Sequence, residues 1–185
     1  MKRLNSLKVL ILLSCATLVF SCAKIANLVS VDFEYNNADL TFTIPASTSG
    51  TAVINGSSMY FNADSLIKSQ SSQLSINNIK SLYVKSCQVD ITAASVGQDL
   101  SALESCSLSV FTANSTTPIE IASLTNNPDV ATKTLNIPVN STTDLSSLLK
   151  NNTTLSYKIT VKTRRAVTTT TDCKATLKFN IKAGL

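Results

Sequence analysis

The side chains in this sequence that could act as nucleophiles or metal ligands are chiefly five cysteines, and the chain has no histidine. Histidine is the commonest general base and a leading zinc ligand, so the group that most often activates a cysteine is missing. Cys87, Cys106 and Cys173 each alternate with apolar neighbours. We therefore predict buried side chains at these positions rather than a catalytic thiol, and we expect no metal site and no cofactor.

A serine three residues before a lysine occurs at Ser65–Lys68 and at Ser147–Lys150. This spacing belongs to the signature of penicillin-binding proteins and related β-lactamases, in which a lysine amine lies beside a serine nucleophile. The chain is so rich in serine that about two such spacings arise by chance. The partner motifs Ser-Asp-Asn and Lys-Thr-Gly are also missing. The sequence therefore identifies no catalytic residue, and we expect a protein that is not an enzyme.

Two acidic residues, Glu34 and Asp39, would lie opposite each other if the chain turned at Asn36-Asn37 between two paired strands. Facing carboxylates repel, and a Ca²⁺ ion with oxygen ligands could relieve the repulsion. Exposed carboxylates in water usually do without such an ion. We therefore expect a solvated pair here and no metal.

Basic side chains gather near the C-terminus: residues 155–185 carry seven basic groups and one acidic group, whereas residues 22–154 carry six and ten. If the strands expected at 155–164 and 173–182 formed a hairpin, their outward lysines would make one basic face suited to lipid phosphates or anionic polysaccharide. The alternative is a solvated face whose lysines deter edge-to-edge aggregation. The members of this candidate anion-binding face are Lys158, Lys162, Lys174, Lys178 and Lys182.

The N-terminal segment combines basic residues, an apolar stretch and a small-residue exit, which are the parts of a secretory signal. Its uncharged stretch, residues 9–23, is 15 residues long, whereas a membrane-spanning helix needs about 20. The run Val19-Phe20-Ser21-Cys22 resembles the lipobox of a bacterial lipoprotein, with Ser21 before the cut and Cys22 as the lipidated first residue. The alternative is an ordinary secreted protein that is cut before Lys24.

The resemblance is to small cell-envelope lipoproteins of the Bacteroidota type. It implies a signal peptide over residues 1–21, a short lipid-anchored tether over 22–27 and at least two acyl chains on Cys22, enough for firm anchoring. Because no acidic cluster follows Cys22, it also implies retention at the outer membrane, facing the periplasm. Removing the three basic residues of the signal leaves thirteen basic and eleven acidic groups, a net charge of +2, so we expect no nucleic-acid partner.

Alternation of apolar and polar residues recurs through the remaining chain and predicts half-buried strands. We expect one all-β domain over residues 28–185, an antiparallel, immunoglobulin-like β-sandwich of about seven to nine strands. Short helical turns are predicted over 63–69, 98–104 and 144–150, with Asn62 and Thr143 as caps of the first and last. The predicted strands are a hairpin of 29–35 with 40–44, then 51–61, 79–92, 105–113, 118–123, 132–139, 155–164 and 173–182.

Two interpretations of the three mature-chain cysteines remain open. They are small buried hydrophobes, or two of them form a bridge in an oxidising periplasm, for which Cys87 and Cys106 are the candidates. An odd count permits at most one internal disulfide.

We expect a membrane-anchored, non-enzymatic module that binds or supports an envelope protein or glycan. The alternatives are a surface-assembly subunit in which an edge strand such as 173–182 adds to a neighbour's sheet, and a soluble secreted sandwich if Cys22 is not lipidated. The sequence does not indicate an oligomeric state.

Overall fold

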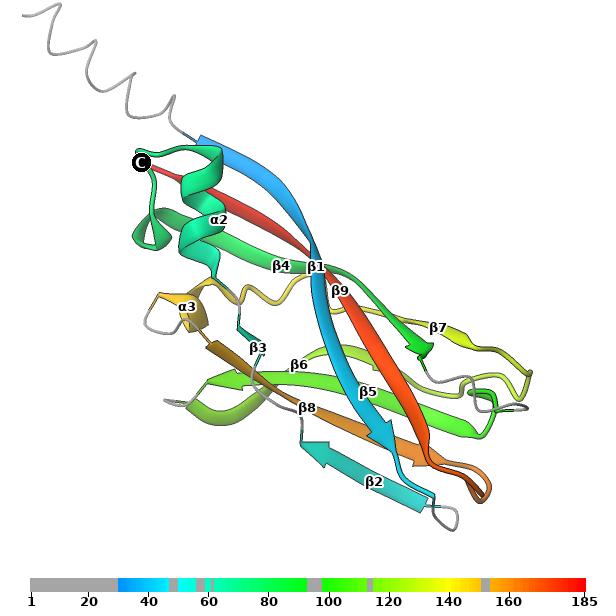
Figure 1. Cartoon of the computed structure of the whole chain (residues 1–185). Helices are drawn as coiled ribbons and strands as arrows, with labels where there is room; N and C mark the ends of the chain where they lie inside the picture. The colour runs from blue at the N-terminus through cyan, green and yellow to red at the C-terminus, as the bar shows by residue number, and fades with distance from the viewer. Residues whose placement is uncertain are drawn as a thin grey trace, which may run out of the picture.

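Two antiparallel β-sheets packed face to face make up this protein, as a computed structural model shows (Figure 1). The predicted all-β sandwich is thereby confirmed. The expected signal peptide and tether, with Cys22, lie outside the described part of the chain. The structure describes residues 30–46, 50–55, 59–60, 62–92, 98–112, 115–150 and 154–185.

One sheet has the order β1-β9-β4-β7, and the other has the order β2-β8-β5-β6 with β3 paired to β8. In the described part of the chain, three short helices, α2, η1 and α3, lie in the connections. The bounds are β1 Ser30–Ile44, β2 Gly50–Asn55, β3 Met59–Tyr60, α2 Ala63–Gln70, η1 Ile76–Asn78, β4 Ile79–Ile91, β5 Leu103–Thr112, β6 Ser115–Leu124, β7 Thr134–Ile137, α3 Ser146–Leu149, β8 Thr154–Thr163 and β9 Thr171–Gly184.

The strand order is that of a jelly roll. With the two-residue β3 set aside, eight strands remain, and their sheet orders are 1-8-3-6 and 2-7-4-5 when they are renumbered along the chain. The first strand therefore pairs with the last, whereas an immunoglobulin sandwich pairs its first strand with the second. The protein is therefore an antiparallel β-sandwich, as predicted, but it has the jelly-roll strand order in place of the immunoglobulin-like one.

β9 lies in the middle of its sheet, hydrogen-bonded to β1 on one side and β4 on the other. Its residues alternate between the buried inner face and the outer face, as the sequence predicts. A central strand has no free edge, so the expectation that 173–182 could be an edge strand is wrong. The buried hydrophobic members of β9 are Cys173, Ala175, Leu177, Phe179, Ile181 and Ala183.

The hairpin predicted at Asn36-Asn37 does not form, because β1 runs on through both residues. Its register against β9 shifts between Tyr35 and Ala38, which marks a β-bulge. The core-facing side chains are odd-numbered and partly buried before this point, and even-numbered and buried after it. An extra residue in a bulge moves the apolar set back to the core face. A bulge and a turn produce the same sequence pattern here.

The acidic pair Glu34 and Asp39 is consequently separated along one strand. Glu34 hydrogen-bonds to Lys85 on β4, and the Asp39 carboxylate lies 3.4 Å from the ammonium of Lys174 on β9. Each carboxylate has its own cation, so the repulsion that suggested a Ca²⁺ ion is absent. Within the described ranges, no group of three or more possible metal-ligating side chains occurs.

The first predicted helical turn is confirmed as α2, where the Asn62 side chain accepts a hydrogen bond from the Ser65 amide at 2.9 Å. The third is shorter than predicted, and Asp144 rather than Thr143 accepts from the Ser146 amide. The turn predicted over 98–104 is wrong, since β5 has already begun at Leu103. No helix in the described part is long and apolar enough to cross a bilayer.

Candidate functional site: a polar pocket at one end of the sandwich

A pocket of about 180 Å³ opens at the end of the sandwich where β8 gives way to β9. There the chain crosses from one sheet to the other through residues 164–170. Ile44 pairs with Thr171 at this end, and Ser30 pairs with Gly184 at the opposite end. The pocket and the start of β1 are therefore separated by the length of β1, roughly 45 Å at about 3.3 Å per residue.

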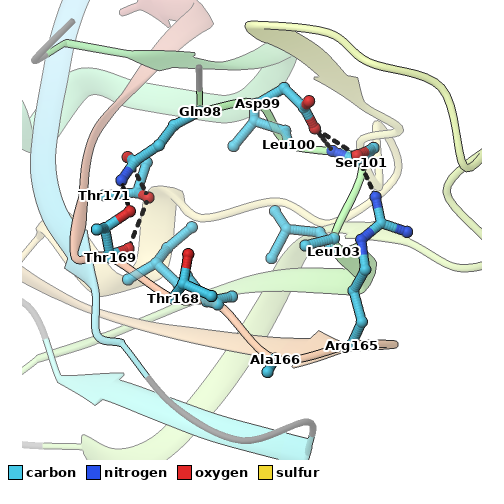
Figure 2. A pocket seen from close by; sticks show the side chains of 13 residues that line it. Gln98, Asp99, Leu100, Ser101, Leu103, Arg165, Ala166, Thr168, Thr169 and Thr171 are labelled. Atoms are coloured by element: carbon cyan, nitrogen blue, oxygen red, sulfur yellow. Dashed lines mark hydrogen bonds between the residues drawn. The ribbon is translucent and has the colours of Figure 1, made fainter. Parts of the chain in front are cut away.

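Two segments far apart in the sequence supply most of the pocket wall, residues 98–103 before and at the start of β5 and residues 165–171 between β8 and β9. Figure 2 shows their side chains as a ring around the cavity. The lining residues are Ile44, Gln98, Asp99, Leu100, Ser101, Ala102, Leu103, Arg165, Ala166, Val167, Thr168, Thr169 and Thr171.

One side of the ring is a chain of charged and hydroxyl groups. The Asp99 carboxylate accepts hydrogen bonds from both the amide and the hydroxyl of Ser101, and these bonds hold the pKa of Asp99 below its usual value. Arg165 donates to the Ser101 hydroxyl at 2.5 Å and forms an ion pair with Asp129 at 2.6 Å. An aspartate that accepts from the amide two residues on makes a tight turn, which explains why this segment is not helical.

The opposite side of the ring is uncharged. The Gln98 amide donates to the Thr169 hydroxyl, and the Thr171 hydroxyl donates to the Gln98 carbonyl oxygen at 2.7 Å. These bonds join the two segments directly (Figure 2). The pocket wall is therefore fixed by its own hydrogen bonds before any ligand arrives.

A buried asparagine supports the 98–103 segment from behind. Asn127 is only 3% exposed, and its side-chain amide donates to the carbonyl oxygens of Leu100 at 3.1 Å and Leu103 at 3.0 Å. The Arg164 guanidinium donates to Leu103 and to the Asn127 carbonyl oxygen. These interactions tie the β6–β7 connection to the pocket wall.

We expect Asn127→Ala to lower the free energy of unfolding by about 1–3 kcal/mol, because a buried carbonyl that loses its donor pays a desolvation cost of that size. Urea denaturation followed by circular dichroism measures the change. Asn136→Ala on the exposed face of β7 is the matched control and should cost less than about 0.5 kcal/mol. Equal losses for the two variants would contradict a supporting role for Asn127.

The five lysines of the candidate anion-binding face do not share one surface. Lys158 and Lys162 lie on β8, and Lys174, Lys178 and Lys182 lie on β9. These strands belong to different sheets, so the hairpin expected between them is wrong. Because the lysines of each strand point away from the shared core, the two groups lie on opposite faces of the sandwich.

Two of these lysines lie next to acidic residues. Lys174 lies next to Asp39 of β1, and Lys162 forms an ion pair with Glu104 at 2.7 Å. Charge that is segregated along the sequence is therefore mixed in space. Anion binding stays a prediction, now for two separate groups of lysines.

The three cysteines of the described chain are all buried, as expected, and the structure has no bridge between them. Cys87 on β4 and Cys106 on β5 line the same void of about 10 Å³ between the sheets. A disulfide between them stays a prediction. None of the three lines the polar pocket.

Neither Ser-x-x-Lys spacing belongs to the pocket. Lys68 forms an ion pair with Asp64 at 2.6 Å within α2. Ser147 lies in α3, and Lys150 is the exposed residue directly after this helix. None of the residues that line the pocket is predicted from the sequence as a site residue. The only local signals for them are the polar run from Thr168 to Asp172 and the adjacent arginines, and both are ordinary features of a loop.

No protein-family model matches this chain, and no curated protein matches its sequence. Among solved structures, a chain of Desmodium yellow mottle tymovirus is similar at 10% sequence identity, with 84% of this chain and 88% of that chain covered. The TM-score of that match is 0.28, so the likeness carries no argument. The jelly-roll order rests on the strand pairing described above, and such a fold hosts too many activities to imply one.

Proposed function

We propose that this chain is a membrane-anchored, non-enzymatic binding module of the bacterial cell envelope, held by lipid on Cys22. The observation that carries the proposal is the position of the lipobox-like run relative to the sandwich. Cys22 precedes Ser30, the first described residue of β1, by eight positions, a span of at most about 28 Å at ~3.5 Å per residue. The anchor thus holds the sandwich by the end at which β1 begins.

The opposite end of the sandwich then projects away from the lipid. It is this end that carries the polar pocket, beside the junction of β8 and β9. Connections between strands are where binding residues are most often found, because the rigid sheets hold them in place. An envelope protein or glycan on the side away from the membrane is the partner that this arrangement suits.

The proposed assembly through strand addition at 173–182 is set aside, since β9 is internal. The outer strands of its sheet are β1 and β7. β1 carries Asp32, Glu34 and Asp39 on its outer face, and charged side chains on an edge strand disfavour pairing with another chain. The β1 edge therefore disfavours strand addition.

Cys22→Ser in the full chain is expected to abolish incorporation of an acyl label and to move the protein from the membrane to the soluble fraction. Without its acyl chains the protein has no lipid anchor, and it can bind the membrane surface only weakly and reversibly. Metabolic labelling with an alkyne fatty acid and membrane fractionation measure both effects. Cys15→Ser is the matched control, because Cys15 ends the earlier run Leu12-Leu13-Ser14-Cys15, and it should leave labelling unchanged. Unchanged membrane association of Cys22→Ser would overturn the proposal.

A further inference from the structure

We infer that the polar pocket binds one neutral sugar unit of a glycan. The envelope origin of that glycan rests on the proposed function, but the binding chemistry stands on the pocket alone. Three properties of the pocket lead to this ligand class, namely its size, its charge balance and the hydrogen-bonding groups that it leaves free.

The volume limits the ligand to a small group. At about 180 Å³ the pocket is smaller than the roughly 300–1,000 Å³ of sites that enclose a drug-sized ligand. A single monosaccharide, bound as one unit or the end unit of a longer chain, is of suitable size. Because the pocket opens at the tip of the sandwich, the rest of a glycan could extend into solvent.

The charges around the cavity disfavour a strongly charged ligand. Asp99 is ionised at neutral pH, since hydrogen bonds from Ser101 lower its pKa, and a carboxylate there opposes an anion. Arg165 lines the same cavity and opposes a cation, whereas its ion-pair partner Asp129 is not among the lining residues. A neutral ligand avoids both penalties.

Two polar groups of the lining have no partner among the described residues. The Oδ1 atom of Asp99 accepts both bonds from Ser101, which leaves Oδ2 as an open acceptor. The Thr168 hydroxyl has no hydrogen bond in the described part of the chain, and it points into the ring in Figure 2. Arg165 has further N–H groups to donate.

A sugar matches this set because each hydroxyl both donates and accepts. One hydroxyl could donate to the Asp99 carboxylate while a neighbour accepts from Arg165, and such bonds to charged groups are stronger than neutral ones. Leu103, Leu100 and Val167 give the cavity an apolar part suited to the C–H face of a sugar ring. A peptide would instead need its backbone amides and carbonyls paired in a row, whereas the side chains that line this cavity are arranged as a ring (Figure 2).

The test is saturation-transfer NMR on the full-length acylated protein in detergent micelles. The probes are the methyl glycosides of glucose, galactose, mannose and N-acetylglucosamine, with the peptide Gly-Ser-Gly as the comparison ligand. We expect at least one glycoside to receive saturation, and an excess of the corresponding free sugar to reduce that saturation. Gly-Ser-Gly should receive none.

The pocket variants are Asp99→Asn and Thr168→Val, each nearly isosteric with the residue that it replaces. Asparagine can still accept from Ser101, so the turn is retained while the charge at the open acceptor is lost. We expect Asp99→Asn to weaken glycoside binding by about tenfold or more and Thr168→Val to weaken it severalfold. Asp32→Asn on β1 and Thr51→Val on β2, both exposed and absent from the pocket lining, should bind like the wild type.

Absence of binding by all four glycosides to folded wild-type protein would overturn the inference, as would binding that both pocket variants retain in full. Saturation of Gly-Ser-Gly that depends on Asp99 would replace the sugar with a peptide. These outcomes are separate from the fate of the proposed function, because membrane release of Cys22→Ser is measured without any sugar. A released Cys22→Ser protein that still binds a glycoside would support both.

Discussion

Phe179→Ala is expected to lower the free energy of unfolding by about 3–5 kcal/mol, the range typical for removing a fully buried aromatic ring from a core. Phe179 is completely buried and lies on the central strand β9. Tyr35 of β1 and Val84 of β4 are its neighbours across the sheet. With a strand on each side and the second sheet facing it, the site can relax little, so most of the cavity should remain. Urea denaturation of purified protein measures the loss.

Phe111→Ala is the matched control, because Phe111 on β5 lies on the partly exposed face of its strand. We expect it to cost about 1 kcal/mol or less. Phe179→Leu retains much of the apolar volume and should cost clearly less than Phe179→Ala, which keeps the comparison informative if the alanine variant does not fold. Similar losses for Phe111→Ala and Phe179→Ala would mean that β9 is not the centre of the core.

Raising the pH from about 9 to about 11 is expected to destabilise the protein steeply through its three buried thiols. Burial raises the pKa of Cys87 and of Cys173 to about 12 and that of Cys106 to about 11, whereas a thiol in an unfolded chain ionises near pH ~8.5. Between these values the unfolded chain has released protons that the folded chain keeps. The free energy of unfolding therefore falls by up to about 1.4 kcal/mol per pH unit for each thiol.

Below pH ~8.5 both states hold the thiol protons, so these groups contribute no pH dependence there. Urea denaturation at pH 7, 9, 10 and 11, with a reductant present, should show a flat region followed by a fall. The variant with alanine at positions 87, 106 and 173 should show a shallower fall, because it lacks these thiols. Parallel pH profiles for the two proteins would show that the thiols are accessible to water in the folded state.

The sequence was sufficient to predict the fold class, because alternation reports which residues share a buried face. β4, β5, β8 and β9 all lie where that pattern places them, within a few residues. Alternation does not report which strands pair. The lysines of β8 and β9 were therefore predicted on one hairpin although the chain crosses between sheets after Thr163.

The pocket could not be predicted from local sequence for a related reason. Asp99 and Thr168 are 69 positions apart, and only the pairing of Leu103 with Thr163, together with the crossing to β9, brings their segments to the same end. Each residue type is common in loops of a chain this rich in serine and threonine. An aspartate that hydrogen-bonds within its own loop has the same local sequence signature as one that caps a helix, so local sequence does not distinguish the turn at Asp99 from a helical turn.

The pairing of β1 with β9 has a consequence for the order of folding events. Ser30 pairs with Gly184, so the two partners come from opposite ends of the described chain, and β4 depends on the same last strand for most of its hydrogen bonds. Contacts of such high sequence separation make folding slow, because a long loop must close before they stabilise anything. Until residues 171–184 are available, neither β1 nor β4 has the neighbour that completes its sheet. The first sheet can therefore be completed only after residues 171–184 have been synthesised, and β9 is the strand that closes it.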